Sequence, residues 1–376
     1  MRASVWNRVD HLQPLLVGML AALGLMTVYS AHADWARQVL WIVLGIAAYG
    51  AALALDYRRL RAIAPGLYVG MLLMLIGVRL VGHSALGAQR WLSVAGFPLQ
   101  PSELSKLMLV LVLAAYLSRG ERLSWRGLGG ILLLVAPPAY LILTQPDLGT
   151  SMVFIAVLLG MLFLAGARPW QLGSLAVTAL VALPLLPHLL HGYQKRRLEI
   201  FLDPSQDPLG SGYNLLQARI AVGAGGLFGQ GWLHGLQGQL GFVPERATDF
   251  VFAIFAEEFG LLGSLVLLAV FGALLVRLLR SAAVAPDRFG ELLVGGVFVM
   301  IFVQVVENIG MNIGLLPIAG IPLPLISYGG SATITTFAGL GLVQSVMLRR
   351  RVVVHRDRMA YADVTAPTGT TVRLPL

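Results

Sequence analysis

The chain has 376 residues, of which 57% are hydrophobic and only 12% are charged, and its mean hydropathy is +0.79. A soluble domain of this length would not carry so much apolar sequence, so the composition indicates a polytopic membrane protein. Cysteine is absent, which excludes disulfides, thiolate metal sites and cysteine nucleophiles. The net charge of +9 does not indicate nucleic acid binding, because the arginines cluster between apolar runs in the positive-inside pattern.

Apolar runs of the length that crosses a bilayer predict an all-α membrane protein, a polytopic bundle of about ten transmembrane helices. The first run follows Arg2 and Arg8 and lacks a small-residue cleavage site, so we interpret it as an anchor that stays on the protein. The expected spans are 12–30, 36–55, 62–82, 103–118, 127–144, 149–166, 171–190, 250–276, 290–309 and 329–348.

The basic residues predict the orientation of these spans. With the N-terminus in the cytoplasm, most arginines fall on the inner side, and an even number of spans returns the C-terminus to that side. Residues 1–348 then form one transmembrane domain, with a long outer loop at 191–249 between spans 7 and 8. The tail, 349–376, is rich in Thr, Pro and charge and is expected to be cytoplasmic and disordered.

Two segments on the predicted outer side are unusual. Residues 209–241 contain ten glycines, which suit close approach of the backbone to a ligand, a mobile lid, or a loop that is merely mobile. Residues 320–331, G-I-P-L-P-L-I-S-Y-G-G-S, follow Asn308 and Asn312 and break the helical pattern at membrane depth. Such broken backbone is tolerated where it lines a cavity.

Residues 241–260 carry a concentration of charge that an apolar chain would not keep without a reason. Charges at a hydrocarbon boundary face a protein interior or a wet cavity, so this segment marks a candidate site. Asp249 has two interpretations: it caps the helix that starts at Phe250, or it works as a catalytic carboxylate. The charged residues here are Glu245, Arg246, Asp249, Glu257 and Glu258.

Other charges lie within or beside the spans. Glu103 and Lys106 are three residues apart on one helix face, so they can neutralise each other as either a structural or a functional ion pair. Arg79 has the length to snorkel to the outer surface, and Glu307 faces either the cavity or a buried partner. Their roles are left open.

Seven motifs are distributed along nearly the whole chain. They are G-A-Q-R-W (87–91), Q-P-S-E-L-S-K (100–106), Q-P-D-L-G-T (145–150), D-P-L-G-S-G-Y-N (207–214), P-E-R-A-T-D-F (244–250), E-E-F-G (257–260) and the 320–331 segment. Together they resemble one family, the SEDS proteins (shape, elongation, division, sporulation), and most of all its elongation branch, the RodA proteins. Two departures, Ala224 and Ala332, stand where the family has serine, and neither affects a carboxylate.

The resemblance implies a peptidoglycan glycosyltransferase that polymerises lipid II at the outer face of the bacterial plasma membrane with a class B penicillin-binding protein as partner. The essential aspartate of the family falls on Asp249, the expected general base of an inverting transfer with polyprenyl diphosphate as leaving group. No metal ligand set is predicted, although a divalent cation such as Mg²⁺ is a candidate for sharing the diphosphate charge. Candidate substrate-binding residues are Arg90, Gln100, Arg196, Arg197, Arg219, Glu245, Arg246, Glu258 and Ser327.

Two other functions are compatible with the charges. A transporter or flippase for the same lipid-linked sugar would place charges at mid-depth on several spans, whereas most charges here lie near the expected outer ends. A scaffold that only activates a partner enzyme would need no ionisable carboxylate at a cavity. Glycan product formed from lipid II by the purified protein would separate the three functions.

Overall fold

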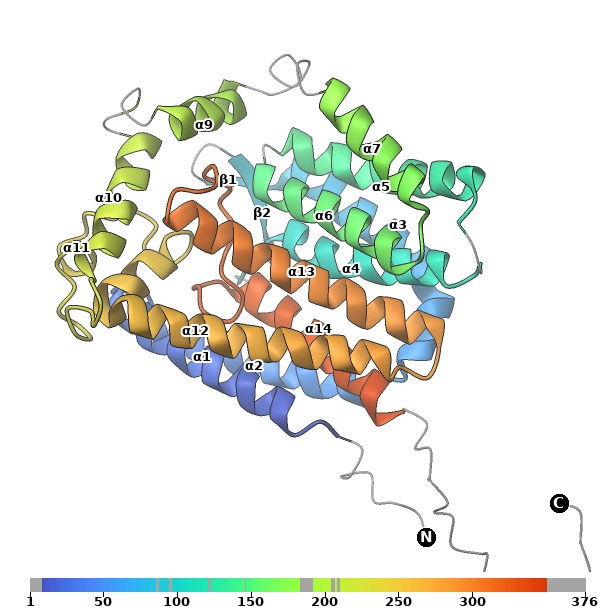
Figure 1. Cartoon of the computed structure of the whole chain (residues 1–376), viewed down its shortest axis with the longest axis horizontal. Helices are drawn as coiled ribbons and strands as arrows, with labels where there is room; N and C mark the ends of the chain where they lie inside the picture. Colours follow the sequence, from blue (N-terminus) through green and yellow to red (C-terminus); the bar gives the residue numbers. More distant parts are fainter. Residues whose placement is uncertain are drawn as a thin grey trace, which may run out of the picture.

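The computed structural model describes residues 9–85, 88–94, 97–120, 123–145, 147–182, 192–203, 207 and 210–349. Helices dominate these residues, with one small sheet between the third and fourth helices (Figure 1). The expected tail begins at the end of this region, so the prediction for residues 350–376 lies outside the described residues.

The helices follow the expected order. Their bounds are α1 Leu12–Ser30, α2 Trp35–Ala54, α3 Tyr57–Val81, α4 Pro101–Leu117, α5 Trp125–Thr144, α6 Leu148–Leu164, α7 Pro169–Ala182, α9 Gly192–Leu202, α10 Ser211–Ala224, α11 Leu236–Gln239, α12 Val251–Ala283, α13 Arg288–Asn312 and α14 Gly330–Leu348.

Each expected span coincides with one helix. Seven described helices, α1, α2, α3, α5, α12, α13 and α14, are long and apolar enough to cross a membrane. The helix α6 is apolar but shorter, while α4 has 17 residues and α7 has 14 in the described region. Residues 183–190 of the expected span 171–190 lie outside the described residues. The fold class is therefore an all-α polytopic membrane protein, and the count of ten spans stays a prediction.

Short polar residues set where several helices begin. In each case a side-chain oxygen of the preceding residue accepts a backbone N–H of the first turn, which satisfies a donor that the helix leaves open. The acceptors are Asp34 for α2, Asp56 for α3, Ser124 for α5, Asp147 for α6 and Asp287 for α13.

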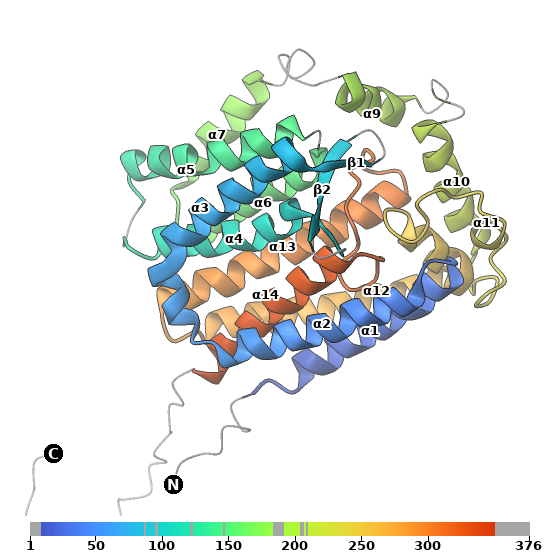
Figure 2. The ribbon, with the colours of Figure 1, turned by 180° about the vertical axis from the view of Figure 1, so that it is seen from behind.

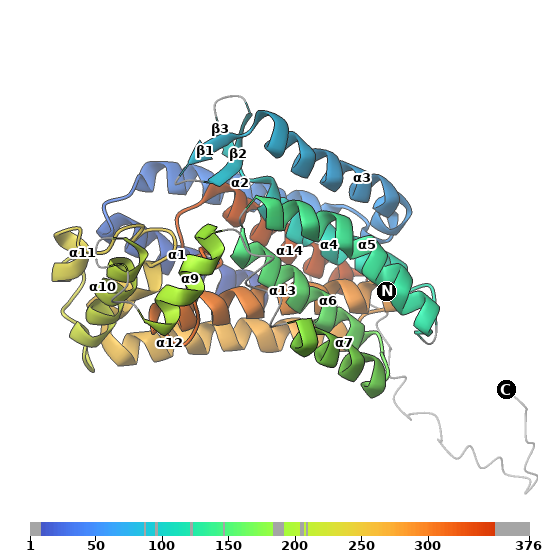
Figure 3. The same ribbon diagram turned by 90° about the horizontal axis from the view of Figure 1, so that it is seen from above.

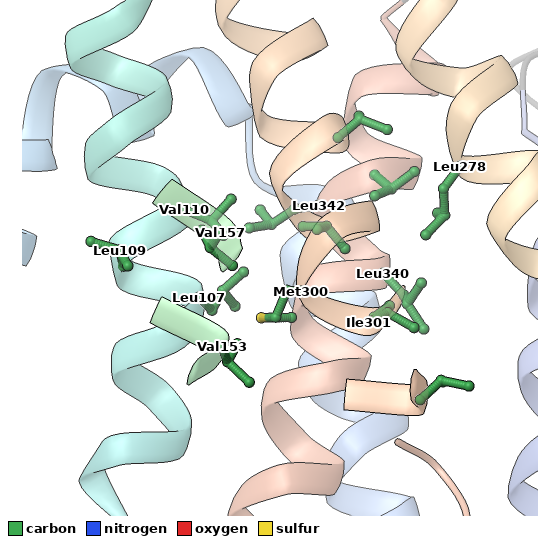
Figure 4. Close-up of a cluster of buried hydrophobic side chains, with 14 of the residues drawn as sticks. Leu107, Leu109, Val110, Val153, Val157, Leu278, Met300, Ile301, Leu340 and Leu342 are labelled. Atoms are coloured by element: carbon green, nitrogen blue, oxygen red, sulfur yellow. The ribbon is translucent and has the colours of Figure 1, made fainter. Parts of the chain in front are cut away.

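The core lies where α4, α13 and α14 pack together. Figure 4 shows side chains of α4, α6, α13 and α14 converging, among them Leu107, Val157, Met300 and Leu340. Most of α4 is buried although it carries Glu103 and Lys106. A helix buried on all sides needs no amphipathic pattern, which is why its sequence is apolar around the whole circumference.

The bundle has two distinct ends, seen in Figures 1 and 2. We call the end that carries α10 and α11 the loop end, and the end at which α1 begins and α14 ends the terminal end. Figure 3 shows the α9–α11 region at the loop end and the α5 and α7 helices extending toward the terminal end.

A three-stranded antiparallel sheet lies at the loop end, between α3 and α4. Its strands are β1 His83–Ala85, β2 Ala88–Val94 and β3 Phe97–Leu99, in the order β1-β2-β3. Leu92 pairs with Leu99, so the chain folds back twice before α4 begins. The sequence indicated an unusual segment here but no strands.

The glycine-rich segment is built into a break in helix α12. Gly260 has φ +67° and ψ −165°, a conformation essentially reserved for glycine, and the helix is interrupted there. Residues of the 225–231 turn replace the missing helical hydrogen bonds: Leu261 N donates to Gly226 O at 2.9 Å, and Gln230 N donates to Glu257 O at 2.9 Å. A Cβ at Gly229 would collide with the backbone of Glu258.

The sequence predicted that these glycines allow approach to a ligand or form a mobile loop, whereas the glycines of the 225–231 turn allow close approach to the backbone of α12. The side chains beside the break hold the rest of the segment. Glu257 accepts Gln237 N at 2.7 Å and Gly238 N at 3.0 Å, and thereby caps the short helix α11. The described part of this loop is therefore mostly helical and hydrogen-bonded into α12.

Candidate functional site

A polar pocket of about 170 Å³ opens at the loop end, where segments distant in sequence meet. Strand β2 supplies Arg90 and Trp91, and α9 supplies Arg197. The turn before α12 supplies Asp249, and the loop between α13 and α14 lines the pocket with Gly320, Pro322 and Tyr328.

The main chain of Asp249 is held from α13. Asn308 Nδ2 and Asn312 Nδ2 donate to Asp249 O at 2.9 and 3.0 Å. Asn308 Nδ2 also donates to Ile321 O at 2.7 Å, so one amide ties the Asp249 turn to the loop that forms the opposite wall. Both asparagines are fully buried, and their hydrogen bonds fix the position of the Asp249 main chain and therefore the point from which its carboxylate extends.

Helix α12 does not use Asp249 as its cap. The helix begins at Val251, and the preceding Phe250 makes no side-chain cap bond. The first-turn donor Ala253 N is satisfied by Asn312 Oδ1 at 3.0 Å, so a neighbouring helix provides the acceptor that a local cap would provide. The capping interpretation of Asp249 is therefore wrong.

The carboxylate of Asp249 instead faces the same point as a guanidinium. A Cβ built on Gly320 would lie 3.4 Å from both Asp249 Oδ2 and Arg197 Nη1, and Gly320 has φ +73°. Arg197 is buried and donates from Nη1 to Ile318 O at 3.0 Å, so the loop next to Gly320 holds its head group. The glycine leaves space that any side chain would occupy.

The surroundings change the acidity of Asp249. Burial raises the pKa of its carboxyl from 3.8 to about 6, opposed by the positive charge of Arg197. The negative charge of Glu245 raises the pKa further, and Arg90 lowers it. At pH 7 the carboxylate is mostly ionised, and its raised pKa makes it a better proton acceptor than an ordinary aspartate.

Three more predicted residues line the pocket with Asp249 and Arg197. Arg90 donates from Nε to Gln145 O at 3.2 Å, which anchors it against the end of α5. Gln100 donates its backbone N–H to Ser331 Oγ at 2.9 Å, and Glu245 accepts Thr248 Oγ1 at 3.2 Å. The pocket thus combines two arginines with two carboxylates.

Five predicted residues do not line the pocket. They contact other parts of the protein: Arg196 pairs with Asp207 at 3.1 Å, Arg219 donates to Gly314 O at 3.1 Å, Arg246 donates to Ala31 O at 2.8 Å, Glu258 accepts Leu233 N at 3.0 Å, and Ser327 Oγ donates to Thr248 O at 2.6 Å. Ser327 still bears on the site, because Thr248 precedes Asp249.

Glu103 and Lys106 form a buried ion pair, with Lys106 Nζ 2.7 Å from Glu103 Oε1. With its amide oxygen turned toward the ammonium, Gln304 accepts a second bond from Lys106 at 2.6 Å. Glu307, one turn further along α13, is also buried. These residues do not line the pocket, and at the surface Arg79 donates to Thr144 Oγ1 at 3.1 Å.

Sequence reasoning missed several residues of the site. Trp91, Gly320 and Tyr328 line the pocket, and Asn308 and Asn312 hold Asp249. The asparagines stood out in the sequence only as polar interruptions before the broken segment. Their spacing of four residues, which puts both amides on one face of a helix, is the signal that could have identified them.

The fold and pocket together define a class: a polytopic membrane protein with a carboxylate and arginines gathered in a pocket at one end of its bundle. A family model described as a cell cycle protein, FtsW/RodA/SpoVE, matches residues 10–352. The chain belongs to this family, as its motifs indicated.

Relatives with known names agree. The chain is 41% identical to peptidoglycan glycosyltransferase MrdB of Escherichia coli K12, over 94% of this chain and 97% of that protein. It is 37% identical to stage V sporulation protein E of Bacillus subtilis, over 90% of this chain and 96% of that protein.

Solved structures show the same fold. One comes from work on the structural coordination of polymerization and crosslinking by a peptidoglycan synthase complex, with TM-score 0.79 and 35% identity over 90% of this chain and 97% of that one. Another is the rod shape determining protein RodA of Thermus thermophilus, with TM-score 0.70 and 33% identity over 92% of this chain and 98% of that one.

Proposed function

We propose that this protein is a peptidoglycan glycosyltransferase that polymerises lipid II into glycan strands during cell elongation. The observation that carries the proposal is the carboxylate of Asp249 facing the guanidinium of Arg197 across Gly320. A proton acceptor beside a fixed cation is what transfer of a sugar from a diphosphate needs. Relatives whose names state this activity, and which match nearly the full chain, support it.

Asp249 is the general base of the proposed reaction. It takes the proton of the acceptor 4-hydroxyl as that oxygen forms a bond to the anomeric carbon of the donor. The bond from that carbon to the diphosphate oxygen breaks, and the configuration inverts. One base suffices because diphosphate leaves readily, and such a base contributes about 10² to 10⁴-fold in rate.

Arg197 and Arg90 stabilise the departing diphosphate. Their planar donors match its oxygens, and a partly enclosed pocket strengthens the interaction relative to water. Among the described residues, no group of three or more His, Asp or Glu side chains could hold a metal ion. The proposal therefore relies on the two arginines, with Mg²⁺ as an additional candidate for the charge.

The protein works in the bacterial plasma membrane, with both termini in the cytoplasm and the loop end outside. Two arguments support this orientation. The arginines are distributed as the positive-inside rule expects, and the family resemblance implies that lipid II is polymerised at the outer face of the membrane. We also propose a class B penicillin-binding protein as partner. The structural match to a peptidoglycan synthase complex supports it, and co-purification from membranes tests it.

The proposal is tested with lipid II and purified Asp249→Asn protein. Asn keeps the shape and the backbone contacts of Asp249 but cannot accept the proton, so glycan synthesis should fall by at least about 100-fold. The matched control is Glu199→Gln on α9, which neutralises an exposed carboxylate outside the pocket and should keep its activity. Near-normal glycan product from folded Asp249→Asn protein would falsify the role of Asp249 as base.

A further inference from the structure

Two cavities that play no part in the proposed reaction meet near the terminal end. One has a volume of about 360 Å³ and lies between the end of α4, the start of α5 and the end of α6. The other, about 270 Å³, is a groove between α3 and α5 with α4 as its floor. Tyr116 and Arg119 line both, so the cavities share a boundary.

The two cavities differ in chemistry. The groove is almost wholly apolar, with walls formed by Pro65, Val69 and Leu134 and a floor formed by Val112 and Ala115. Val69 is 53% exposed on the outside of the bundle, where the hydrocarbon of a membrane would reach it. An apolar groove of this kind accepts a hydrocarbon chain.

The end cavity is mixed in character and adjoins a helix start. Arg119 and Ser124 line it, together with Gly127, whose backbone N–H in the first turn of α5 donates to the capping Ser124 Oγ at 3.0 Å. The N-terminal turn of a helix carries partial positive charge and favours an anion. A guanidinium beside that turn adds a full positive charge and several donors.

At the terminal end, the described carboxylates do not compete with a bound anion for the arginines beside the end cavity. The described carboxylates at this end are each already paired with an arginine: Asp10 with Arg277, Asp56 with Arg349, Asp287 with Arg58 and Glu291 with Arg288.

By contrast, Arg119, Arg126 and Arg168 make no ion pair within the part of the chain that the structure describes. Arg126 precedes the lining residue Gly127, and Arg168 follows the lining residue Ala165 by three positions. The loops that carry them are tied together, because Gln171 Nε2 donates to Leu123 O at 3.0 Å.

We propose that these cavities form a binding site for an anionic phospholipid. Its phosphate lies in the end cavity beside Arg119 and the start of α5, and one acyl chain follows the groove between α3 and α5. Exposed Trp125 and Trp170 flank the same end, where aromatic rings favour the headgroup region of a membrane. Basic pockets between transmembrane helices are suited to acidic headgroups.

The test is lipid retention by the full chain, measured by native mass spectrometry after exchange into mixed lipid. Phosphatidylglycerol should be retained about tenfold better than phosphatidylcholine with the same chains, since a charge-assisted contact is worth about one power of ten. Arg119→Gln should remove this preference. Arg280→Gln, which neutralises an exposed arginine of α12 outside both cavities, should keep it.

The groove is tested separately. Val69→Trp fills it and should lower retention of both lipids, whereas Leu73→Trp, an exposed position of α3 outside the groove, should not. Glycerol phosphate, which lacks the chains, should not displace the bound lipid. The proposal is overturned if Arg119→Gln keeps the preference, if Val69→Trp binds normally, or if glycerol phosphate competes as well as the lipid.

Discussion

Asp249 is held through its main chain, and its carboxylate is left facing the pocket. Its position depends on Asn308 and Asn312, which follow it in the chain by 59 and 63 residues. The sequence indicated Asp249 as a candidate because an acid beside a long apolar run is unusual, and its role as a base came from the family resemblance. It could not identify the asparagines as its supports, because that role exists only once α13 packs beside the turn.

The first prediction concerns the pH dependence of activity. With a pKa of about 6, Asp249 is protonated below that pH and ionised above it. Therefore kcat/KM for glycan synthesis should fall about tenfold per pH unit below pH 6 and be level above it. Glu245→Gln removes a negative charge that raises this pKa, so the acid limb should move to lower pH. If the acid side of the pH profile does not move in the Glu245→Gln protein, the fall in kcat/KM does not report the protonation of Asp249.

Stability should respond to pH in the opposite sense. Because the native pKa lies above the value of 3.8 for an ordinary aspartate, the folded protein keeps a proton that the unfolded chain has lost between about pH 4 and pH 6. The contribution of Asp249 to the free energy of unfolding therefore decreases as pH rises through that window. At pH 7.5 the Asp249→Asn protein should have a higher thermal midpoint than the wild type.

Lys106 provides the third prediction. It lies fully buried between Glu103 and Gln304, so Lys106→Ala leaves an unpaired carboxylate inside the bundle. The loss should be about 3–5 kcal/mol of stability, and the double change with Glu103→Ala should recover part of it. The exposed pair of Lys195 and Glu199 is the control, since Lys195→Ala should cost less than about 1 kcal/mol. Strictly additive losses for Glu103 and Lys106 would show that they are not coupled.

At the scale of elements, apolar runs predicted the helices well because a membrane requires long apolar segments with internally satisfied backbone. The sheet at 83–99 escaped prediction because two of its strands have three residues, too few for a periodic pattern. The helices of the 191–249 loop escaped for another reason. Two of them, α10 and α11, are stabilised by contacts with α12, such as the hydrogen bonds that Gln237 N and Gly238 N of α11 donate to Glu257.

The break in α12 gives the fourth prediction. Gly260→Ala places a side chain at a left-handed φ and against the backbone of Gly229, so it should cost more than about 2 kcal/mol and lower the yield of folded protein. Gly272→Ala on the same helix has open space and should be neutral or stabilising by up to about 1 kcal/mol. Thermal midpoints measured in one detergent compare the two, and equal behaviour would contradict the described break.

At the scale of the whole molecule, the orientation in the membrane is the fifth prediction. Because the chain has no cysteine, Ser124→Cys, Ser205→Cys and Thr368→Cys can each be probed with an impermeant thiol reagent without background. Only the protein with cysteine at position 205 should react in intact cells. Positions 205 and 368 lie outside the described residues and serve only as labelling sites. Reaction at position 124 or 368 would reverse the orientation.

The break in α12 and the pocket also differ in when they can form as the chain is made. The 225–231 turn precedes Gly260 by about 30 residues, so both partners of the break leave the ribosome close together, and their contacts are local in sequence. The pocket instead combines Arg90, Asp249 and Ser331. It cannot form until Asn308, Asn312 and the loop after them have been synthesised. A nascent chain that has reached the end of α12 therefore already has the contacts that support the 225–231 turn, but its pocket is not yet complete.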